Sequence, residues 1–183
     1  MEFKEMETER LWLVKITDEH TQRYFDIMSN DDVTRYYGMN SLESIEEAER
    51  LIKSFRVTFE NRRGARWGLV WKDTGEFIGT VGLNNLNLRS KKAEVGFELH
   101  PDYWQKGITT EAVKAVLRYA FEELNLYRMG AVTFPQNKAS ITLLERIGFQ
   151  KEGLLRGYLY QNDRSHDVLI FSLLSTEYAE RKW

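Results

Sequence analysis

A chain of 183 residues, 42% of them hydrophobic, is long enough to form one domain with a sizeable buried core. The 26 Lys and Arg residues and 28 Asp and Glu residues give a formal net charge of −2, which argues against a surface built mainly to bind nucleic acid. The absence of cysteine excludes disulfides, thiolate metal ligands and an acyl-cysteine intermediate. The three histidines have no metal-binding spacing, so we expect no metal.

The chain contains no run of about 18 apolar residues, so we expect no membrane-spanning helix. Residues 1–10 are charged and lack the apolar segment of a secretory signal, which predicts a cytoplasmic location. There is no internal repeat, no low-complexity stretch and no linker rich in Pro, Gly or Ser. We therefore expect residues 1–183 to form a single domain.

The first half of the chain is predicted to form a strand, two helices and a hairpin. Asp18 is the expected N-cap of the first helix, and Ser44 with Glu47 is the expected capping box of the second. Gly75 can supply the positive φ that a tight hairpin turn needs. The expected ranges are a strand at 10–16, helices at 19–28 and 44–59, and strands at 66–71 and 76–83.

The second half begins with a strand over 91–100 that Pro101 ends. Alternation places Val95, Phe97 and Leu99 on one face and the polar Glu94 and Glu98 on the other. A helix at 109–124, a strand at 126–133, a helix at 138–147 between the caps Asn137 and Gly148, and strands at 149–158 and 166–174 follow. This order predicts an α/β or α+β protein with a mixed sheet.

The segment HPDYWQKGITTEA at 100–112 is the most informative part of the chain. A loop that follows a strand and leads into a long helix can form an anion-binding nest, because successive backbone N–H groups and the positive end of the helix dipole converge there. Gly107 permits close approach of a ligand, and Lys106, Thr109 and Thr110 could contact phosphate oxygens. The alternative is an ordinary strand–helix connection that happens to contain a glycine.

Two motifs together resemble a known family. The first is Trp104 to Thr109 (WQKGIT), which is similar to the acetyl-CoA pyrophosphate loop of the GCN5-related N-acetyltransferases (GNAT). The second is the pattern N-x-x-S at 137–140 followed by Gly-Phe at 148–149. TERL at 8–11 and His166-Asp167 resemble the branch that acetylates the N-termini of ribosomal proteins. The resemblance implies a mixed, mostly antiparallel sheet of about seven strands, with a splayed central pair and helices on both faces.

The resemblance also implies where acetyl-CoA binds. Pantetheine would lie between the strands at 93–100 and 126–133, the pyrophosphate would sit on backbone amides near 105–110, and the thioester would lie near the start of the 138–147 helix. The implied cofactor-binding residues are Phe97, Glu98, Leu99, Gln105, Lys106, Gly107, Ile108, Thr109, Thr110, Asn137 and Ser140.

The sequence departs from the family pattern at two positions. Thr109 stands where the loop usually has Gly or Ala, but its backbone amide is still available. Leu144 stands where many members carry a tyrosine that protonates the leaving thiolate, and leucine cannot donate a proton. Ser140, or a water that it holds, is the expected replacement, and Tyr158 is a second candidate.

The amine that attacks the thioester must first lose a proton. A free α-amino group has a pKa of about 7.7–8.0 and a lysine one of about 10.4, so a weak base suffices for a protein N-terminus. Glu98 and Glu94, on the polar face of the cofactor strand, are the candidate catalytic bases. The alternative is that each is a solvated carboxylate or a salt-bridge partner.

An acceptor groove could be lined by the aromatic residues Tyr36, Tyr37 and Trp67, although these residues could equally belong to the core. Tyr36, Tyr37 and Gly38 lie between the two early helices, where the family places its substrate loop. We expect an enzyme that acetylates a protein N-terminus. The alternatives are acetylation of a small amine, such as a polyamine, amino sugar or amino-acid derivative, and a CoA-binding module without turnover. An edge strand near the C-terminus could pair with a second copy to form a homodimer.

Overall fold

The computed structural model describes residues 2–181, which form one eight-stranded sheet in the order β1-β2-β3-β4-β5-β6-β8-β7. Every neighbouring pair is antiparallel except β5–β6. β7 forms one edge, and the expected pairing of this strand with a second copy stays a prediction. The strands are β1 (Met6–Glu7), β2 (Leu11–Lys15), β3 (Ala65–Trp71), β4 (Glu76–Asn87), β5 (Lys92–Leu99), β6 (Arg128–Thr133), β7 (Gln150–Gln161) and β8 (Arg164–Leu174).

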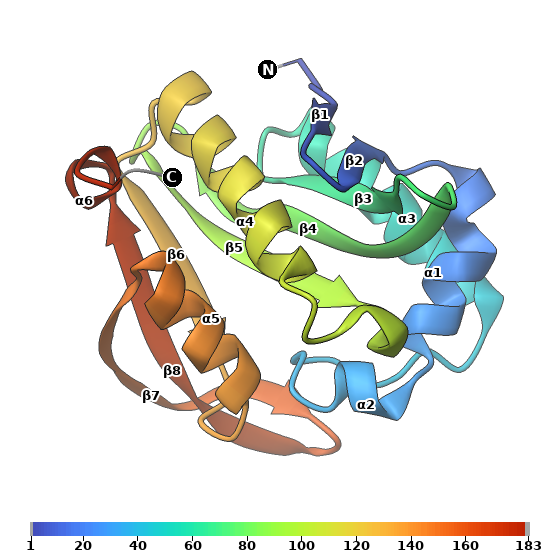
Figure 1. Cartoon of the computed structure of the whole chain (residues 1–183). Helices are drawn as coiled ribbons and strands as arrows, with labels where there is room; N and C mark the ends of the chain where they lie inside the picture. The colour runs from blue at the N-terminus through green and yellow to red at the C-terminus, as the bar shows by residue number, and fades with distance from the viewer. Residues whose placement is uncertain (1, 182–183) are drawn as a thin grey trace.

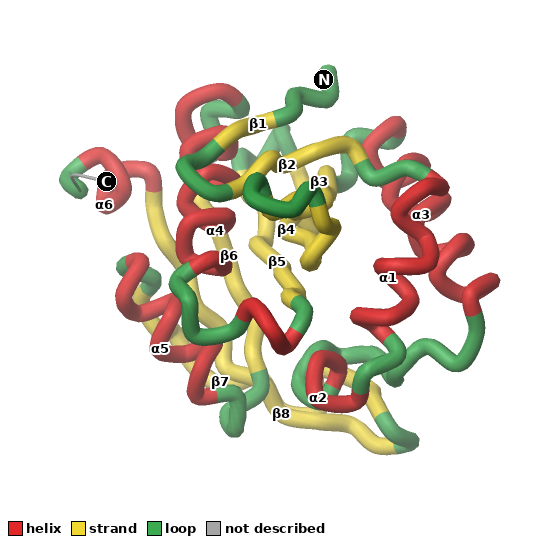
Figure 2. The backbone as a smooth tube through the Cα atoms, turned by 45° about the vertical axis from the view of Figure 1, so that its right-hand side comes forward, coloured by secondary structure: helices red, strands yellow, loops and turns green. Residues whose placement is uncertain are grey.

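Helices cover both faces of the sheet, as the family resemblance implied (Figure 1). α4 lies on one side of the strands β2–β5, and α1 and α3 lie on the other (Figure 2). α5 packs beside β6 and β7. The helices are α1 (Thr21–Met28), α2 (Asp31–Thr34), α3 (Ile45–Glu60), α4 (Ile108–Arg118), α5 (Lys138–Ile147) and α6 (Ser175–Ala179). None of the helices described combines the length and the apolar composition needed to cross a membrane.

The parallel pair β5–β6 is hydrogen-bonded over a short stretch only. Lys92, Ala93 and Glu94 pair with Arg128, Met129 and Gly130, and beyond these residues the two strands separate. Figure 1 shows β6, β8 and β7 turning away from the rest of the sheet at this point. The expected splayed central pair is therefore present.

The local signals in the second half of the chain correspond to physical contacts. Asn137 caps α5 by accepting a hydrogen bond from the backbone N–H of Ser140, and Gly148 ends that helix in the left-handed conformation at φ 109°. The apolar stripe of α4 packs into the main core, where Ala112, Val113 and Val116 have no exposed surface.

Three details of the expected elements are wrong. The first helix is preceded by a 3-10 turn at Asp18–His20 whose N-cap is Thr17 rather than Asp18. The capping box at the start of α3 is not formed, because the Glu47 carboxylate accepts from the N–H of Glu43 at 2.7 Å instead of from Ser44. The last turn of the expected 109–124 helix is a π-turn at Tyr119–Glu123.

The elements β1, α2 and α6 were not expected. Each of them is two to five residues long, and so short a segment carries no readable periodicity.

Gly79 allows β4 to lie close to β5. A Cβ at this position would be 2.2 Å from the backbone oxygen of Glu98 and 2.9 Å from the Cα of Leu99. We expect Gly79→Ala to lower the free energy of unfolding by about 1–3 kcal/mol, since backbone atoms cannot move aside cheaply. Urea unfolding followed by circular dichroism measures the change.

Gly153 in β7 is the matched control, because a Cβ there would meet nothing within 4 Å. We expect Gly153→Ala to change stability by no more than about 0.5 kcal/mol. Equal urea midpoints for the two variants would show that the close approach at Gly79 does not constrain the sheet.

Candidate active site

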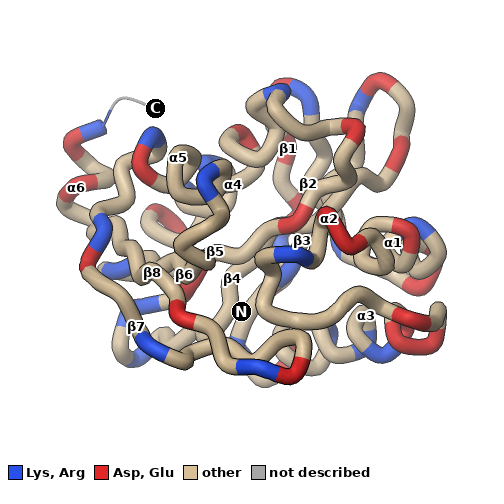
Figure 3. The backbone as a smooth tube through the Cα atoms, turned by 90° about the horizontal axis from the view of Figure 1, so that it is seen from below, with Lys and Arg blue, Asp and Glu red and all other residues tan. Residues whose placement is uncertain are grey.

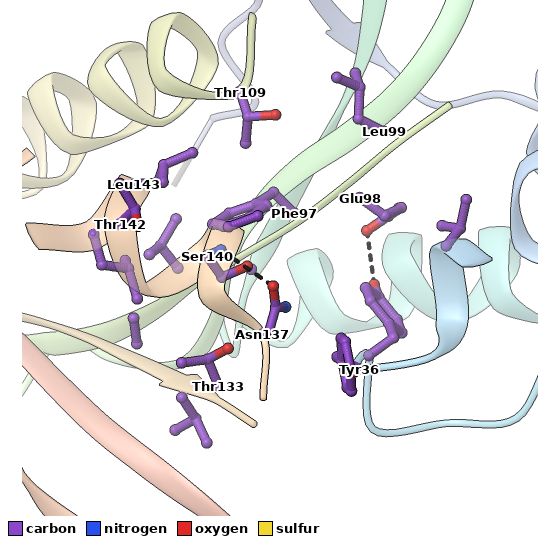
Figure 4. A pocket seen from close by; sticks show the side chains of 18 of the residues that line it. Tyr36, Phe97, Glu98, Leu99, Thr109, Thr133, Asn137, Ser140, Thr142 and Leu143 are labelled. Carbon is purple, nitrogen blue, oxygen red and sulfur yellow. Dashed lines mark hydrogen bonds between the residues drawn. The ribbon is translucent and has the colours of Figure 1, made fainter. Parts of the chain in front are cut away.

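A cavity of about 1210 Å³ opens where β5 and β6 separate. Its walls come from β5, the loop before α4, the first turn of α4, the end of β6, the first half of α5 and the segment around α2. In Figure 4, Thr133, Asn137 and Ser140 lie on one side of the opening, and Glu98 and Tyr36 lie on the other. The expected site residues that line the cavity are Tyr36, Tyr37, Glu94, Phe97, Glu98, Leu99, Gln105, Gly107, Ile108, Thr109, Thr110, Asn137 and Ser140.

One wall is the edge of β5 that faces β6. Beyond Glu94 no strand within residues 2–181 pairs with this edge, so backbone N–H and C=O groups between Val95 and Leu99 face the cavity unpaired by the sheet. Buried backbone groups need hydrogen-bond partners. An extended ligand with amide groups, lying along this edge, would supply them in the way a neighbouring strand does.

The loop before α4 has the expected shape of an anion nest. Gln105 and Gly107 have positive φ values of 60° and 73°, and Gly107 is the N-cap of α4. The first N–H groups of a helix have no partner within it, so the amides of Ile108, Thr109 and Thr110 are available to an anion, and the helix dipole favours negative charge there.

The Lys106 side chain does not contribute to this nest, contrary to expectation. Its ammonium group donates to the backbone oxygen of Asp102 at 2.7 Å and lies over the ring of Tyr103, and the residue does not line the cavity. The attraction of that ring and carbonyl holds the cation on the outer side of the loop.

The loop is braced from behind by a residue whose role could not be foreseen. Arg10 donates to the backbone oxygen of Lys106 at 2.9 Å and to the Glu111 carboxylate at 2.7 Å. Glu111 also accepts from the Thr8 hydroxyl at 2.6 Å. Burial alone would raise the pKa of Glu111, but these hydrogen bonds outweigh it and lower the pKa. The TERL motif was visible in the sequence, but the loop that it supports lies almost a hundred residues away.

A buried polar network forms the floor of the cavity on the side of Tyr36 and Tyr37. The Glu98 carboxylate accepts from Tyr37 at 2.8 Å, from Arg66 at 3.1 Å and from Thr80. The side chains of Glu98 and Arg66 are only 1% and 8% exposed. Arg66 also donates to the Asn84 side chain at 3.0 Å. Of the two interpretations made from the sequence, Glu98 therefore has the geometry of a salt-bridge partner.

Tyr37 is locked in the same network. Burial raises the pKa of its hydroxyl, and the neighbouring Glu98 charge raises it further, so the group stays protonated and donates. Tyr36, the next residue along the chain, lines the cavity with its ring 5.8 Å from that of Phe134.

Glu94 lies on the same face of β5 but is less enclosed. It is partly exposed, it lines the cavity, and it accepts a hydrogen bond from the Asn85 side chain at 3.0 Å. Over the intervening Gly96, Asn84 and Arg66 occupy the space next to the strand. A polar strip thus runs along this face from Glu94 to Glu98.

Thr133, at the end of β6, provides a test of whether the cavity fits a polar ligand. It is buried and lines the cavity, and its hydroxyl has no hydrogen-bond partner among residues 2–181. An unpaired buried hydroxyl is costly, so a ligand that supplies a partner at this position is favoured. The amide-bearing arm of CoA fits this requirement, and this residue had no signal in the sequence.

Trp67 was expected to contact the acceptor, and this is wrong. The residue lies in β3 in the middle of the sheet with no exposed surface, and its indole N–H donates to the backbone oxygen of Lys4 at 2.7 Å. Its ring packs against Phe3 and Tyr119 in the core. Alternation along a strand does not tell which face meets solvent, so the aromatic pattern could not separate core from groove.

Leu144 occupies the position at which many family members carry a proton-donating tyrosine. It is buried in the core, and it also lines the cavity. Tyr158, the second candidate acid, lines the cavity and is half exposed. Among residues 2–181 there is no group of three His, Cys, Asp or Glu side chains placed to hold a metal ion.

Comparison with known proteins agrees with this geometry. Residues 10–150 match the family described as Acetyltransferase (GNAT) domain. The chain is 44% identical to the “Uncharacterized N-acetyltransferase YoaA” of Bacillus subtilis (strain 168), over 94% of this chain and 97% of that protein. It is 33% identical to the “Putative ribosomal N-acetyltransferase YdaF” of the same organism, over 80% and 79%.

Among solved structures, spermidine N-acetyltransferase from Vibrio cholerae in complex with CoA and spermine superposes with a TM-score of 0.82 and 23% identity. The similarity covers 94% of this chain and the whole of that one. At this level of identity, the likeness concerns the fold.

Proposed function

The chain belongs to the GNAT family of acetyltransferases, and we propose that its acetyl acceptor is the N-terminal α-amine of a protein. As a member of this family it is an acetyl-CoA-dependent N-acetyltransferase. The similarity to a relative named for ribosomal N-acetylation supports a protein acceptor, and a ribosomal protein is the specific form of the proposal.

The observation that carries the proposal is the charge of the cavity. Its lining includes the acids Asp32, Glu94 and Glu98 but also four bases, so it has no surplus of negative charge. Asp32 is paired with Arg35 at 2.6 Å, and Glu98 is paired as described. A polyamine carries several positive charges and needs unpaired carboxylates, whereas a peptide N-terminus brings only one. Figure 3, a view from below, shows Lys and Arg positions interspersed with Asp and Glu positions along the chain.

Acetyl-CoA would be held by three sets of groups in this proposal. The pantetheine arm pairs with the free edge of β5 near Phe97 and with the Thr133 hydroxyl. The pyrophosphate is bound by amides between Gly107 and Thr110. The side-chain nitrogen of Asn137 faces the same arm, since its oxygen is used to cap α5.

Proton transfer is assigned to groups on the two sides of the cavity. Bound acetyl-CoA supplies the thioester, whose C–S bond breaks as the new C–N bond forms. We assign the amine proton to Glu94, directly or through one water, because its carboxylate is the less occupied of the two. Glu98 then acts as a positioning residue that holds Tyr37. Ser140 relays to the CoA thiolate the second proton, which the amine nitrogen loses on becoming an amide, so its own hydroxyl is restored; it does this in place of the missing tyrosine at Leu144.

The proposed acceptor is tested by thiol release from acetyl-CoA, measured with Ellman's reagent. The protein has no cysteine and therefore gives no background. We expect release with peptides that begin with Ala, Ser or Met, and none when the same α-amine is acetylated. Release only with spermidine, amino sugars or free amino acids would contradict the proposal, and CoA binding without release on any amine would indicate a binding module.

The base assignment predicts a loss that depends on pH. Glu94→Gln should lower kcat/KM for a peptide by about 100-fold at pH 7, where most of the amine is protonated. The loss should shrink above pH 9, since a neutral amine no longer needs a base. Thiol-release rates between pH 6.5 and 9.5 measure this dependence.

Glu98→Gln is the comparison variant for that series. We expect it to lower the rate by the same factor at every pH, because its effect passes through Tyr37 and Arg66. If the kcat/KM of Glu98→Gln recovered at high pH while that of Glu94→Gln did not, Glu98 and not Glu94 would be the base.

The contact of Arg10 with the loop predicts the direction of the Gly107 backbone N–H, one of the amides assigned to the pyrophosphate. The peptide bond is trans, so its C=O and N–H point in opposite directions. Because Arg10 holds the oxygen of Lys106 outside the cavity, the N–H of Gly107 points inward. Arg10→Ala should therefore raise the KM for acetyl-CoA about tenfold. Activity with S-acetylpantetheine, which lacks the pyrophosphate, should not change.

Arg23 offers the matched control for this experiment. It pairs with Glu76 and donates to the backbone oxygen of Phe77, but it does not line the cavity. Arg23→Ala should leave the KM for both donors unchanged. If Arg10→Ala weakens the two donors equally, the residue supports the fold in general and does not aim the amide.

A further inference from the structure

A buried glutamine at the end of β7 is bonded to the segment that carries Tyr36 and Tyr37. Gln161 is 4% exposed. Its side-chain nitrogen donates to the backbone oxygens of Thr34 at 2.8 Å and Met39 at 2.7 Å, and its side-chain oxygen accepts from the N–H of Gly38 at 3.1 Å. Both donor hydrogens and the acceptor of this amide are thus used on one short segment.

The rest of the β7–β8 turn strengthens this attachment. The N–H of Asn162 donates to the Asn40 side chain at 2.9 Å. Gly38 has a φ of 91°, and a Cβ on it would lie 3.1 Å from a methyl group of Leu159. Figures 1 and 2 both show the β7–β8 turn next to α2 and the loop that follows it.

The same end of the sheet also contacts Tyr36, an aromatic residue that lines the cavity, through His166 in β8 and Phe134. A ring nitrogen of His166 lies 3.0 Å from the backbone oxygen of Gln161, and its ring lies 5.2 Å from that of Phe134. Phe134 in turn lies against Tyr36. A continuous row of contacts therefore leads from the backbone of Gln161 to the Tyr36 side chain, which lines the cavity.

We propose that Gln161 is a positioning residue that sets acceptor choice by fixing residues 34–39 over the cavity. The attachment places the Tyr36 ring in the wall and leaves the Tyr37 hydroxyl in reach of Glu98. Such an aromatic wall suits the side chain of the first residue of a peptide. The proposal deepens the proposed function and rests on it, because it takes the acceptor to be a peptide that enters on this side.

Two substitutions test the attachment. Gln161→Glu keeps the size of the side chain but points a carboxylate at the carbonyl oxygens of Thr34 and Met39, whereas Gln161→Ala removes all three hydrogen bonds. We expect both variants to raise the KM for the acceptor peptide about tenfold. We also expect them to reduce the difference in rate between peptides that begin with different residues. The KM for acetyl-CoA should stay unchanged.

Gln150, at the opposite end of the same strand, is the matched control. Its side chain is exposed and bonds to Glu177, far from the segment at 34–39 along the strand. Gln150→Ala should alter neither KM. Asn40→Ala removes one exposed hydrogen bond of the same attachment, so it should give a smaller shift in the same direction and guards against a Gln161 variant that does not fold.

Hydrogen exchange supplies a readout that does not depend on which amine is the acceptor. We expect faster exchange at residues 34–40 in Gln161→Ala, with α4 unchanged. If exchange at residues 34–40 becomes faster but the enzyme acetylates only a small amine, Gln161 does hold this segment and the proposed peptide acceptor is wrong. Unchanged exchange at 34–40, or a KM for acetyl-CoA that rises together with that for the acceptor, would overturn the role of Gln161.

Discussion

The short pairing between β5 and β6 is the constraint on which the site depends. Three residue pairs join the strands, and the sheet is then open. An open edge inside a protein is costly unless a ligand or another chain satisfies it. An extended, amide-bearing molecule lying in the opening between β5 and β6 would complete the sheet. This opening is surrounded by the loop before α4, by the cap of α5 and by the Thr133 hydroxyl, which has no hydrogen-bond partner in the described part of the chain.

The ion pair of Arg66 and Glu98 keeps the other side of the cavity in shape. Removing two charges from water is expensive, and close contacts with Tyr37, Thr80 and Asn84 offset that cost. Such a network has few alternative arrangements in which every group is satisfied. It therefore holds Tyr37, and with it the α2 segment, in one position relative to β5.

The structural features that could be predicted from the sequence are those formed by residues close together in the chain. The caps of α5 and the apolar stripe of α4 could be predicted because each involves residues within a few positions of one another. Trp67 was wrongly assigned to the acceptor groove because the alternating pattern of a strand does not show which face of the sheet is covered by other elements. Arg10 contacts the loop across 96 residues of sequence, and Gln161 contacts Thr34 across 127, so no local pattern marks these contacts.

This difference in sequence separation explains why the acetyl donor is easier to infer from the sequence than the acceptor. The groups assigned to the donor lie mainly in two continuous segments, 93–110 and 133–140, whose spacing forms a recognisable motif. The side proposed for the acceptor is assembled from α2 and its following loop, β3, β4 and the β7–β8 turn. The Gln161 and Arg66 contacts join these elements, so we expect a change in one of them to affect the others. The names of a putative ribosomal and a spermidine acetyltransferase among the similar proteins illustrate that one fold serves different acceptors.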